Sequence, residues 1–224
     1  MDQSLLQAVQ ALAQARDVAL GGNVTDEPVD WEIEACSTTV FRSYTLYRVV
    51  RWVKWMYETW YLGWTPGQDP YWLEGDPVSF LNMAQADGVC LESVAAIWEY
   101  AEWYLVITQH QHYWDEFLLI ESVDQARFLD DIDADMTPLE IWRKETFKEQ
   151  YRSRIGQPSL FQFQQTTALE VFALHGRNLE LHHLLLDRSG YLSHTRTVLE
   201  TDLPLAVAGY GSRSLISGYI WHKY

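Results

Sequence analysis

Residues 160–200 read LFQFQQTTALEVFALHGRNLELHHLLLDRSGYLSHTRTVLE, and this stretch decides the fold. Apolar and polar residues alternate over 160–174, and a run of strand length follows at 179–187. The sequences HGRN and DRSG, which follow these two runs, are turn signals. The pattern predicts two or three antiparallel strands, and the tail from residue 203 is expected to supply one or two more.

The chain before this stretch differs in composition and in charge. Ten of the eleven tryptophans lie between Trp31 and Trp142. Residues 1–150 hold 26 acidic and 9 basic residues, whereas residues 151–224 hold 5 acidic and 7 basic ones. The breaker cluster RIGQPS, around Gly156 and Pro158, separates the two parts. We therefore predict two domains, residues 1–155 and residues 156–224.

Helical patterns dominate the first part, so the predicted fold class is α+β. A helical, tryptophan-rich, acidic N-terminal part is followed by a small antiparallel β-rich part. Residues 3–20 have the apolar spacing of an amphipathic helix, and residues 23–35 are predicted as a loop. Residues 40–62 are apolar on almost every side and are predicted as a largely buried helix with one charged stripe.

Local capping signals mark further helices. Asp76 followed by Pro77 predicts the start of a helix that ends at Asp87 and Gly88. A second helix is expected from residue 89 to about residue 109. Thr137, Pro138 and Glu140 form a capping-box signature, which predicts another helix after an acidic segment.

The helix pair at 77–108 resembles the helix-turn-helix of bacterial regulators and small antitoxin-type domains. The matching positions are Ala84, Gly88, Val94 and Ile97. The resemblance implies DNA binding through the second helix. That helix departs from the family pattern. It presents acids such as Glu99 and Glu102 at positions where binding to the base edges and phosphates of DNA requires basic or amide side chains.

Two other segments are candidates for binding. Arg48, Arg51 and Lys54 would share one face of the predicted helix, with Trp55 beside them. They either neutralise neighbouring carboxylates or contact an acidic partner or a nucleic-acid backbone.

The second candidate segment is the glycine-rich tail, with Gly209, Gly211 and Arg213. It resembles the loop of the RAMP-type RNA-binding subunits of CRISPR complexes, which implies a ferredoxin-like fold and RNA held by backbone amides. A hairpin with conformationally permissive glycines is the alternative interpretation.

Motifs for catalysis or metal binding are weak. The sequence contains no HExxH and no paired cysteines, and no GxSxG elbow surrounds a serine. His182 and His183 are adjacent and would lie on opposite faces of a strand. A hydrolase would need one of them to meet Glu180 or Asp187. We therefore predict no catalytic residue, no metal and no cofactor.

The cellular context follows from the cysteines and the charges. Cys36 and Cys90 stand alone, which favours a reducing compartment. The first residues lack the pattern of a signal peptide, and four ionisable residues within residues 48–58 argue against a membrane span. A cytoplasmic location is therefore expected.

The expected function is a non-enzymatic subunit or adaptor of a larger protein or ribonucleoprotein assembly. It would bind a protein partner through an acidic, aromatic-rich surface. Nucleic acid would be contacted only indirectly or through the local basic stripe. The first alternative is a nucleic-acid-binding regulator or RAMP-type CRISPR subunit, which would use the helix pair, the stripe and the tail. The second is a small hydrolase that uses the C-terminal histidines.

Overall fold

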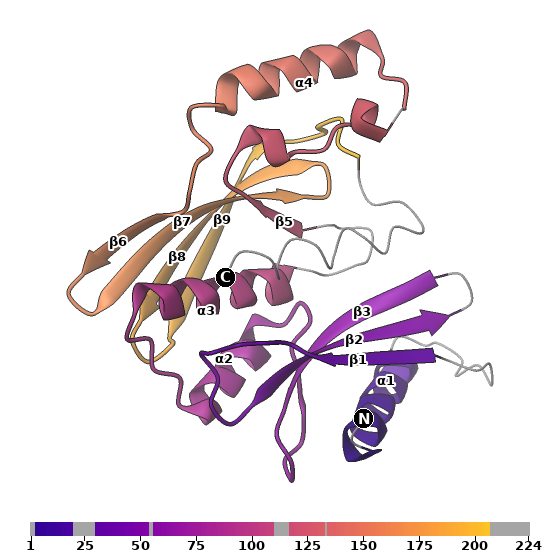
Figure 1. Cartoon of the computed structure of the whole chain (residues 1–224), viewed down its shortest axis with the longest axis vertical. Helices are drawn as coiled ribbons and strands as arrows, with labels where there is room; N and C mark the ends of the chain where they lie inside the picture. Colours follow the sequence, from indigo (N-terminus) through magenta and orange to yellow (C-terminus); the bar gives the residue numbers. More distant parts are fainter. Residues whose placement is uncertain (1–2, 20–29, 54–55, 110–116, 133, 207–224) are drawn as a thin grey trace. The chain divides into compact units, whose positions relative to one another are not determined.

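The computed structural model describes residues 3–19, 30–53, 56–109, 117–132 and 134–206. Its elements, labelled in Figure 1, are α1 (Gln3–Ala19), β1 (Asp30–Ala35), β2 (Thr45–Val53), β3 (Met56–Trp64), β4 (Tyr71–Trp72), α2 (Pro77–Asp87), α3 (Val94–Gln109), β5 (Phe117–Ile120), two short 3-10 helices (Val123–Gln125 and Leu129–Ile132), α4 (Pro138–Tyr151), β6 (Ser159–Phe163), β7 (Thr166–His175), β8 (Asn178–Asp187) and β9 (Leu192–Glu200).

The chain divides into two compact units. Unit 1 contains Met1–Gln111 together with Arg188–Tyr191, and unit 2 contains His112–Asp187 together with Leu192–Tyr224. The predicted boundary at residue 155 falls inside unit 2, between α4 and β6. The α+β class is confirmed, since the four α-helices of the described residues precede residue 156 and antiparallel strands follow it.

Unit 1 contains a four-stranded antiparallel sheet in the order β1-β2-β3-β4. The predicted helix at 40–62 is therefore wrong, because this segment contains β2 and most of β3. The predicted loop at 23–35 is wrong in its last residues, which form β1. Residues 40–62 are rich in Val, Trp and Tyr. Such residues pack well on the pleated surface of a sheet, which explains why this segment forms strands.

Helices lie on both faces of this sheet. On one face, Leu5, Val9 and Ala13 of α1 pack in a buried cluster with Val49 and Trp60, among other sheet residues. The opposite face meets α2 and α3. There Met83 lies against Gly63, and the rings of Tyr61 and Trp103 are 6.4 Å apart.

The ends of α2 agree with the sequence prediction. The Asp76 carboxylate accepts hydrogen bonds from the backbone N–H groups of Val78 and Ser79, and Gly88 ends the helix in the left-handed conformation. Asp87, the last residue of α2, is buried. Its carboxylate accepts hydrogen bonds from the N–H groups of three consecutive residues, Arg42, Ser43 and Tyr44, at 2.6–2.9 Å. Asp87 therefore holds the segment that leads into β2.

The turn between β8 and β9 belongs to unit 1. The Leu91 N–H donates to the carbonyl of Arg188 at 2.9 Å, and the buried Tyr100 hydroxyl donates to the carbonyl of Gly190 at 2.7 Å. Gly190 has φ +82°, and an added Cβ would lie 3.2 Å from Val89. Glycine is therefore required at this turn both by its conformation and by the close approach.

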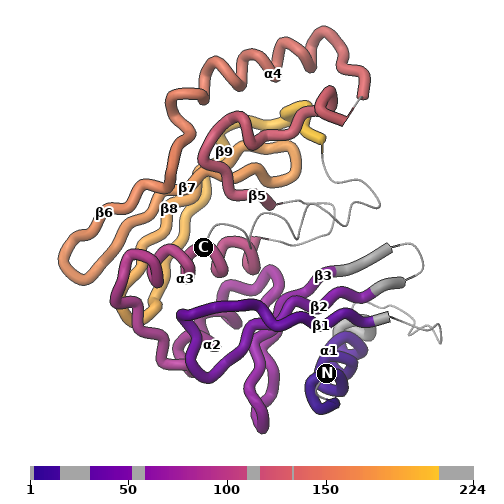
Figure 2. The backbone as a smooth tube through the Cα atoms, in the orientation of Figure 1, coloured from indigo at the N-terminus to yellow at the C-terminus, as the bar shows by residue number. Residues whose placement is uncertain are grey.

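Unit 2 is a five-stranded antiparallel sheet. Strands β7, β8 and β9 are consecutive hairpin partners, as the turn signals predicted. Strands β5 and β6 both pair with β7, β5 along residues 172–175 and β6 along residues 166–170, as the backbone path in Figure 2 lets the reader follow.

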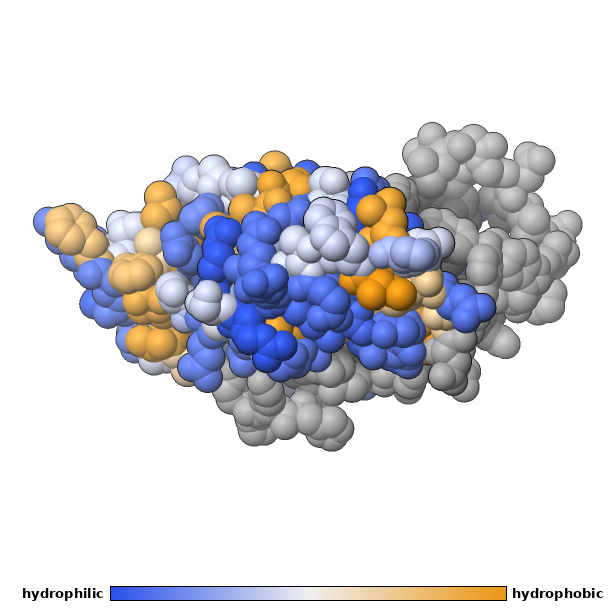
Figure 3. Space-filling model, turned by 90° about the horizontal axis from the view of Figure 1, so that it is seen from above, coloured by the Kyte–Doolittle hydropathy of each residue, from blue (hydrophilic) through white to orange (hydrophobic). Residues whose placement is uncertain are grey.

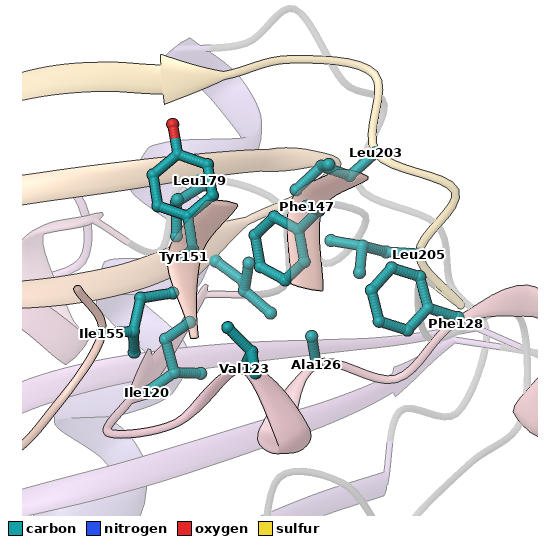
Figure 4. Close-up of a cluster of buried hydrophobic side chains, with 11 residues drawn as sticks. Ile120, Val123, Ala126, Phe128, Phe147, Tyr151, Ile155, Leu179, Leu203 and Leu205 are labelled. Atoms are coloured by element: carbon teal, nitrogen blue, oxygen red, sulfur yellow. The ribbon is translucent and has the colours of Figure 1, made fainter. Parts of the chain in front are cut away.

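Helix α4 and the 3-10 helices cover one face of the unit 2 sheet. Figure 4 shows the resulting core, in which Phe147 and Tyr151 of α4 point towards Leu179 of β8 and Phe128. The Tyr151 hydroxyl donates to the Glu200 carboxylate at 2.9 Å. The capping box of Thr137 and Glu140 at the start of α4 is confirmed. Within the described ranges, no helix is long and apolar enough to cross a bilayer.

Candidate functional site

The structure does not bring Arg48 and Arg51 to one face. Both lie on β2, three residues apart, so their side chains point to opposite sides of the sheet. Arg48 forms an ion pair with Glu34 of β1, with Nη2 to Oε2 at 2.9 Å. The Arg51 guanidinium lies over the ring of Trp60, 4.8 Å from its centroid. Both arginines therefore have partners within unit 1.

The other predicted site residues lie outside the described residues. These are Lys54, Trp55, Gly209, Gly211 and Arg213. The helix pair is present as α2 and α3, although α3 begins at Val94 rather than at residue 89. The Glu99 carboxylate of α3 accepts hydrogen bonds from the N–H and hydroxyl groups of Thr39, so this acid has an intramolecular role.

A shallow pocket of about 400 Å³ lies over β1 and β2, lined by Trp31, Glu32, Ile33, Glu34, Arg48 and Val50. The Arg48–Glu34 ion pair occupies part of its wall. The pocket therefore offers two acids and an arginine that is already engaged, which is a poor arrangement for an anionic ligand.

The densest group of ionisable side chains lies on the unit 2 sheet. Glu180 and His182 are two residues apart on β8 and so share a face. The pairing of β9 brings His194 and Arg196 to that face, and the pairing of β7 brings His175. We call these five residues the histidine cluster. Glu180 and His182 are both buried, at 1% and 0% exposure.

The carboxylate of Glu180 is the centre of the histidine cluster. Its Oε2 atom lies 3.2 Å from Nε2 of His182 and 3.4 Å from Nδ1 of His175, and its Oε1 atom lies 3.4 Å from Nη1 of Arg196. Nδ1 of His182 and Nε2 of His194 are 2.8 Å apart and share a hydrogen bond. The carboxylate and the two imidazoles thus lie in a row, in which a hydrogen bond joins the two imidazoles while Oε2 of Glu180 and Nε2 of His182 are close without one.

Burial and charge set the protonation of the histidine cluster. Burial alone would raise the pKa of Glu180, but the ring nitrogens of His175 and His182 and the charge of Arg196 hold it at about 2. Burial, the neighbouring His182 and the charge of Arg196 lower the pKa of His194 to about 4. At neutral pH, Glu180 is therefore an anion and His194 is a neutral imidazole.

The arrangement limits the chemistry that the histidine cluster can support. A neutral His194 can orient or donate a hydrogen bond at pH 7, and it can exchange a proton only in acid. His183 lies on the other face of β8 and pairs with Glu170 at 3.1 Å. No three His, Cys, Asp or Glu residues in the described part of the chain are placed to hold a metal ion.

The outer face of α4 combines apolar and acidic side chains. Leu139, Ile141 and Trp142 are 59%, 50% and 62% exposed. Trp142 lies about one turn after Leu139 and one turn before Glu145, with Glu149 a further turn along, and both acids are exposed. Figure 3, seen from the side where α4 lies in Figure 1, shows apolar atoms set among hydrophilic ones. We call these five residues the α4 face.

The basic residues of α4 are directed to the body of unit 2. Lys144 forms an ion pair with Asp130 at 2.5 Å, and this contact raises the pKa of Lys144 and lowers that of Asp130. Lys148 lies 5.2 Å from the ring centroid of Phe128. Arg143 donates to the carbonyl of Asp202 at 2.8 Å. The α4 face is therefore left with apolar and negative groups.

Most tryptophans have a different role from Trp142. Trp60, Trp64 and Trp103 are buried in unit 1, and Trp31, Trp72 and Trp98 are partly buried. Among the tryptophans whose side chains the structure describes, Trp142 is the exposed one. The sequence predicted an aromatic-rich surface but did not place it on α4. The signal that could have identified α4 is the apolar set Leu139, Ile141 and Trp142 beside the capping box of Thr137 and Glu140.

Comparison with known proteins assigns no relative to this chain: no family model matches it, and neither a curated protein nor a solved structure shows significant similarity.

Proposed function

We propose that this protein is a non-enzymatic subunit or adaptor of a larger assembly and that it binds a basic protein partner through the α4 face. One observation carries the proposal: Trp142, Leu139 and Ile141 are exposed beside Glu145 and Glu149, while the bases of the same helix are engaged elsewhere. Exposed apolar side chains that cluster in this way are typical of interaction surfaces.

The chemistry of the α4 face indicates what the partner presents. A tryptophan offers a large contact area and a small loss of conformational entropy, so it is a common centre of binding energy. Glu145 and Glu149 favour Lys or Arg on the partner, and the formal charge of −15 would attract a basic protein over longer distances. We therefore expect a partner that presents an apolar surface bordered by basic residues.

The test is a comparison of proteins retained from native lysate by immobilised variants. Trp142→Ala should leave the fold intact because the side chain is exposed, and it should weaken partner binding by more than about tenfold. Tyr191→Ala is the matched control, since Tyr191 is an aromatic residue with 69% exposure outside α4. Glu145→Lys should weaken binding through charge, mainly in low salt.

The expected result is a basic protein that the wild type and Tyr191→Ala retain and that both α4 variants lose. Retention of the same proteins by all four chains would show that the α4 face does not bind them. A wild-type chain that retains no protein would contradict the adaptor function itself.

A second candidate is a hydrolytic reaction that uses the histidine cluster. The observation in its favour is the 3.2 Å approach of Glu180 to His182, with His194 hydrogen bonded beyond it. The rate of such a reaction should change with an apparent pKa of about 4, because His194 is the least buried residue of the Glu180–His182–His194 row. The test measures the rate of hydrolysis of chromogenic esters between about pH 3 and 7 by the wild type and by His194→Gln. Equal rates for the two proteins would exclude a role for His194.

A further inference from the structure

Strand β6 has an edge with which none of the described strands pairs. Its inner edge pairs with residues 166–170 of β7, and β5 occupies the other half of the same side of β7. Figure 1 shows β6 as the outer strand of this end of the sheet. An outer edge presents backbone N–H and C=O groups that another strand can use.

The side chains of β6 do not protect this edge. Residues 156–169 contain no charged residue, although the whole chain carries a formal charge of −15. Phe161 and Phe163 are 62% and 75% exposed. Natural edge strands usually carry charges, bulges or prolines that block pairing, and here only Pro158, just before the strand, has that effect.

The register of the β6–β7 hairpin shows which backbone groups are available. Phe163 pairs with Thr166, so the connecting turn has two residues and its closing pair is hydrogen bonded. Because hydrogen-bonded and non-hydrogen-bonded pairs alternate, Phe163 and Phe161 direct their backbone groups towards β7. Leu160 and Gln162 therefore direct their N–H and C=O groups outwards.

These outward groups are self-complementary. If a second β6 approaches antiparallel with Phe161 on the two-fold axis, Leu160 lies opposite Gln162 of the other copy. By symmetry, Gln162 then lies opposite Leu160 of the other copy. Both pairs are hydrogen bonded in this register, and Phe161 faces its own counterpart in a closely spaced pair. Pro158 would be the next outward residue, and its missing N–H ends the ladder.

We propose that β6 is a self-association edge, at which a second copy of this chain pairs antiparallel through Leu160 and Gln162. A second copy fits better than a foreign strand for two reasons. The register satisfies the two-fold symmetry, and an uncharged segment is where two chains of charge −15 repel each other least. A pairing of five residues buries less surface than a standard interface, so the dimer is weak and forms at high protein concentration.

The test is sedimentation of the full chain over a concentration series, with charge variants at the axis. Phe161→Glu and Phe161→Lys each place like charges opposite each other and should raise the dimer dissociation constant at least about tenfold. An equimolar mixture of the two should recover association, because Glu then faces Lys. The exposure of Phe161 makes folding of both variants expected, and circular dichroism checks it.

Leu185→Glu and Leu185→Lys are the matched controls, because Leu185 is exposed on a strand away from this edge. Hydrogen exchange adds a readout by residue: the amides of Leu160 and Gln162 should become protected as concentration rises, whereas those of Phe161 and Phe163 should not change. A wild type that stays monomeric up to about 1 mM would overturn the proposal. So would a mixture that fails to associate, or amide protection that appears only with added foreign peptide.

Discussion

His194 allows the histidine cluster to be tested through stability. Its folded pKa of about 4 lies below the value of 6.5 for an unperturbed histidine, first because of burial and then because of His182 and Arg196. Glu180, which is ionised, acts in the opposite direction. As pH falls from 6.5 towards 4, the unfolded chain binds a proton at His194 and the folded chain does not. The free energy of unfolding therefore decreases as pH falls through this window.

The magnitude follows from the two pKa values. The loss of stability caused by protonation of His194 in the unfolded chain is close to zero at pH 7.5, about 1 kcal/mol at pH 5.5, and about 3 kcal/mol at pH 4. Urea unfolding at about pH 7.5 and pH 5.5 keeps the protein above its sequence pI of about 4.7. The variant His194→Gln cannot titrate at this position, so between these two pH values its free energy of unfolding should fall by about 1 kcal/mol less than that of the wild type.

His183→Gln is the control, since it removes a histidine from the same strand pair but from the other, more exposed face. The change in unfolding free energy between the two pH values is compared among the wild type, His194→Gln and His183→Gln. If His194→Gln and the wild type lose equal stability between the two pH values, His194 is not held neutral by its surroundings, and the argument for the histidine cluster is wrong.

Substitutions in unit 1 test three of the contacts described above. Asp87→Ala removes the acceptor of three backbone N–H groups and should lower the free energy of unfolding by about 3 kcal/mol, whereas Asp87→Asn should lower it less; urea titration measures both. Gly63→Ala would place a Cβ 2.0 Å from Sδ of buried Met83 and should lower the free energy of unfolding by about 1–3 kcal/mol. The double variant Gly63→Ala/Met83→Ala should lose less than the sum of the losses of the two single variants, because Met83→Ala removes the clash. Arg51→Gln removes the cation above Trp60 and should lower the free energy of unfolding by about 1 kcal/mol, which a thermal melt measures. An unchanged melting temperature would favour a recognition role for Arg51 instead.

Local signals in the sequence predicted local structure well. The caps at Asp76 and Thr137 act within one helical turn, so their outcome does not depend on distant residues. The turn signals HGRN and DRSG likewise set the hairpins of β7, β8 and β9, because a short turn determines which strands are neighbours.

The errors concern segments whose structure depends on distant partners. The spacing of Arg48, Arg51 and Lys54 matches a helix, yet Arg48 meets Glu34 only because β1 pairs with β2. In the histidine cluster, Glu180 and His182 could be placed together by strand alternation alone. His175, His194 and Arg196 join them through the pairing register of three strands, and no spacing within a single segment reports that register.

The contact of Gly190 with Tyr100 also affects how the protein is made. Unit 1 contains residues up to 111, but its last four residues follow 76 residues of unit 2 in the chain. At ordinary rates of translation, about ten seconds pass between the synthesis of α3 and that of the turn that accepts the Tyr100 hydroxyl. During that interval the Tyr100 hydroxyl of the nascent first unit lacks the Gly190 carbonyl. A gene truncated after residue 111 would never supply this carbonyl, so unit 1 should be expressed with residues 188–191 present.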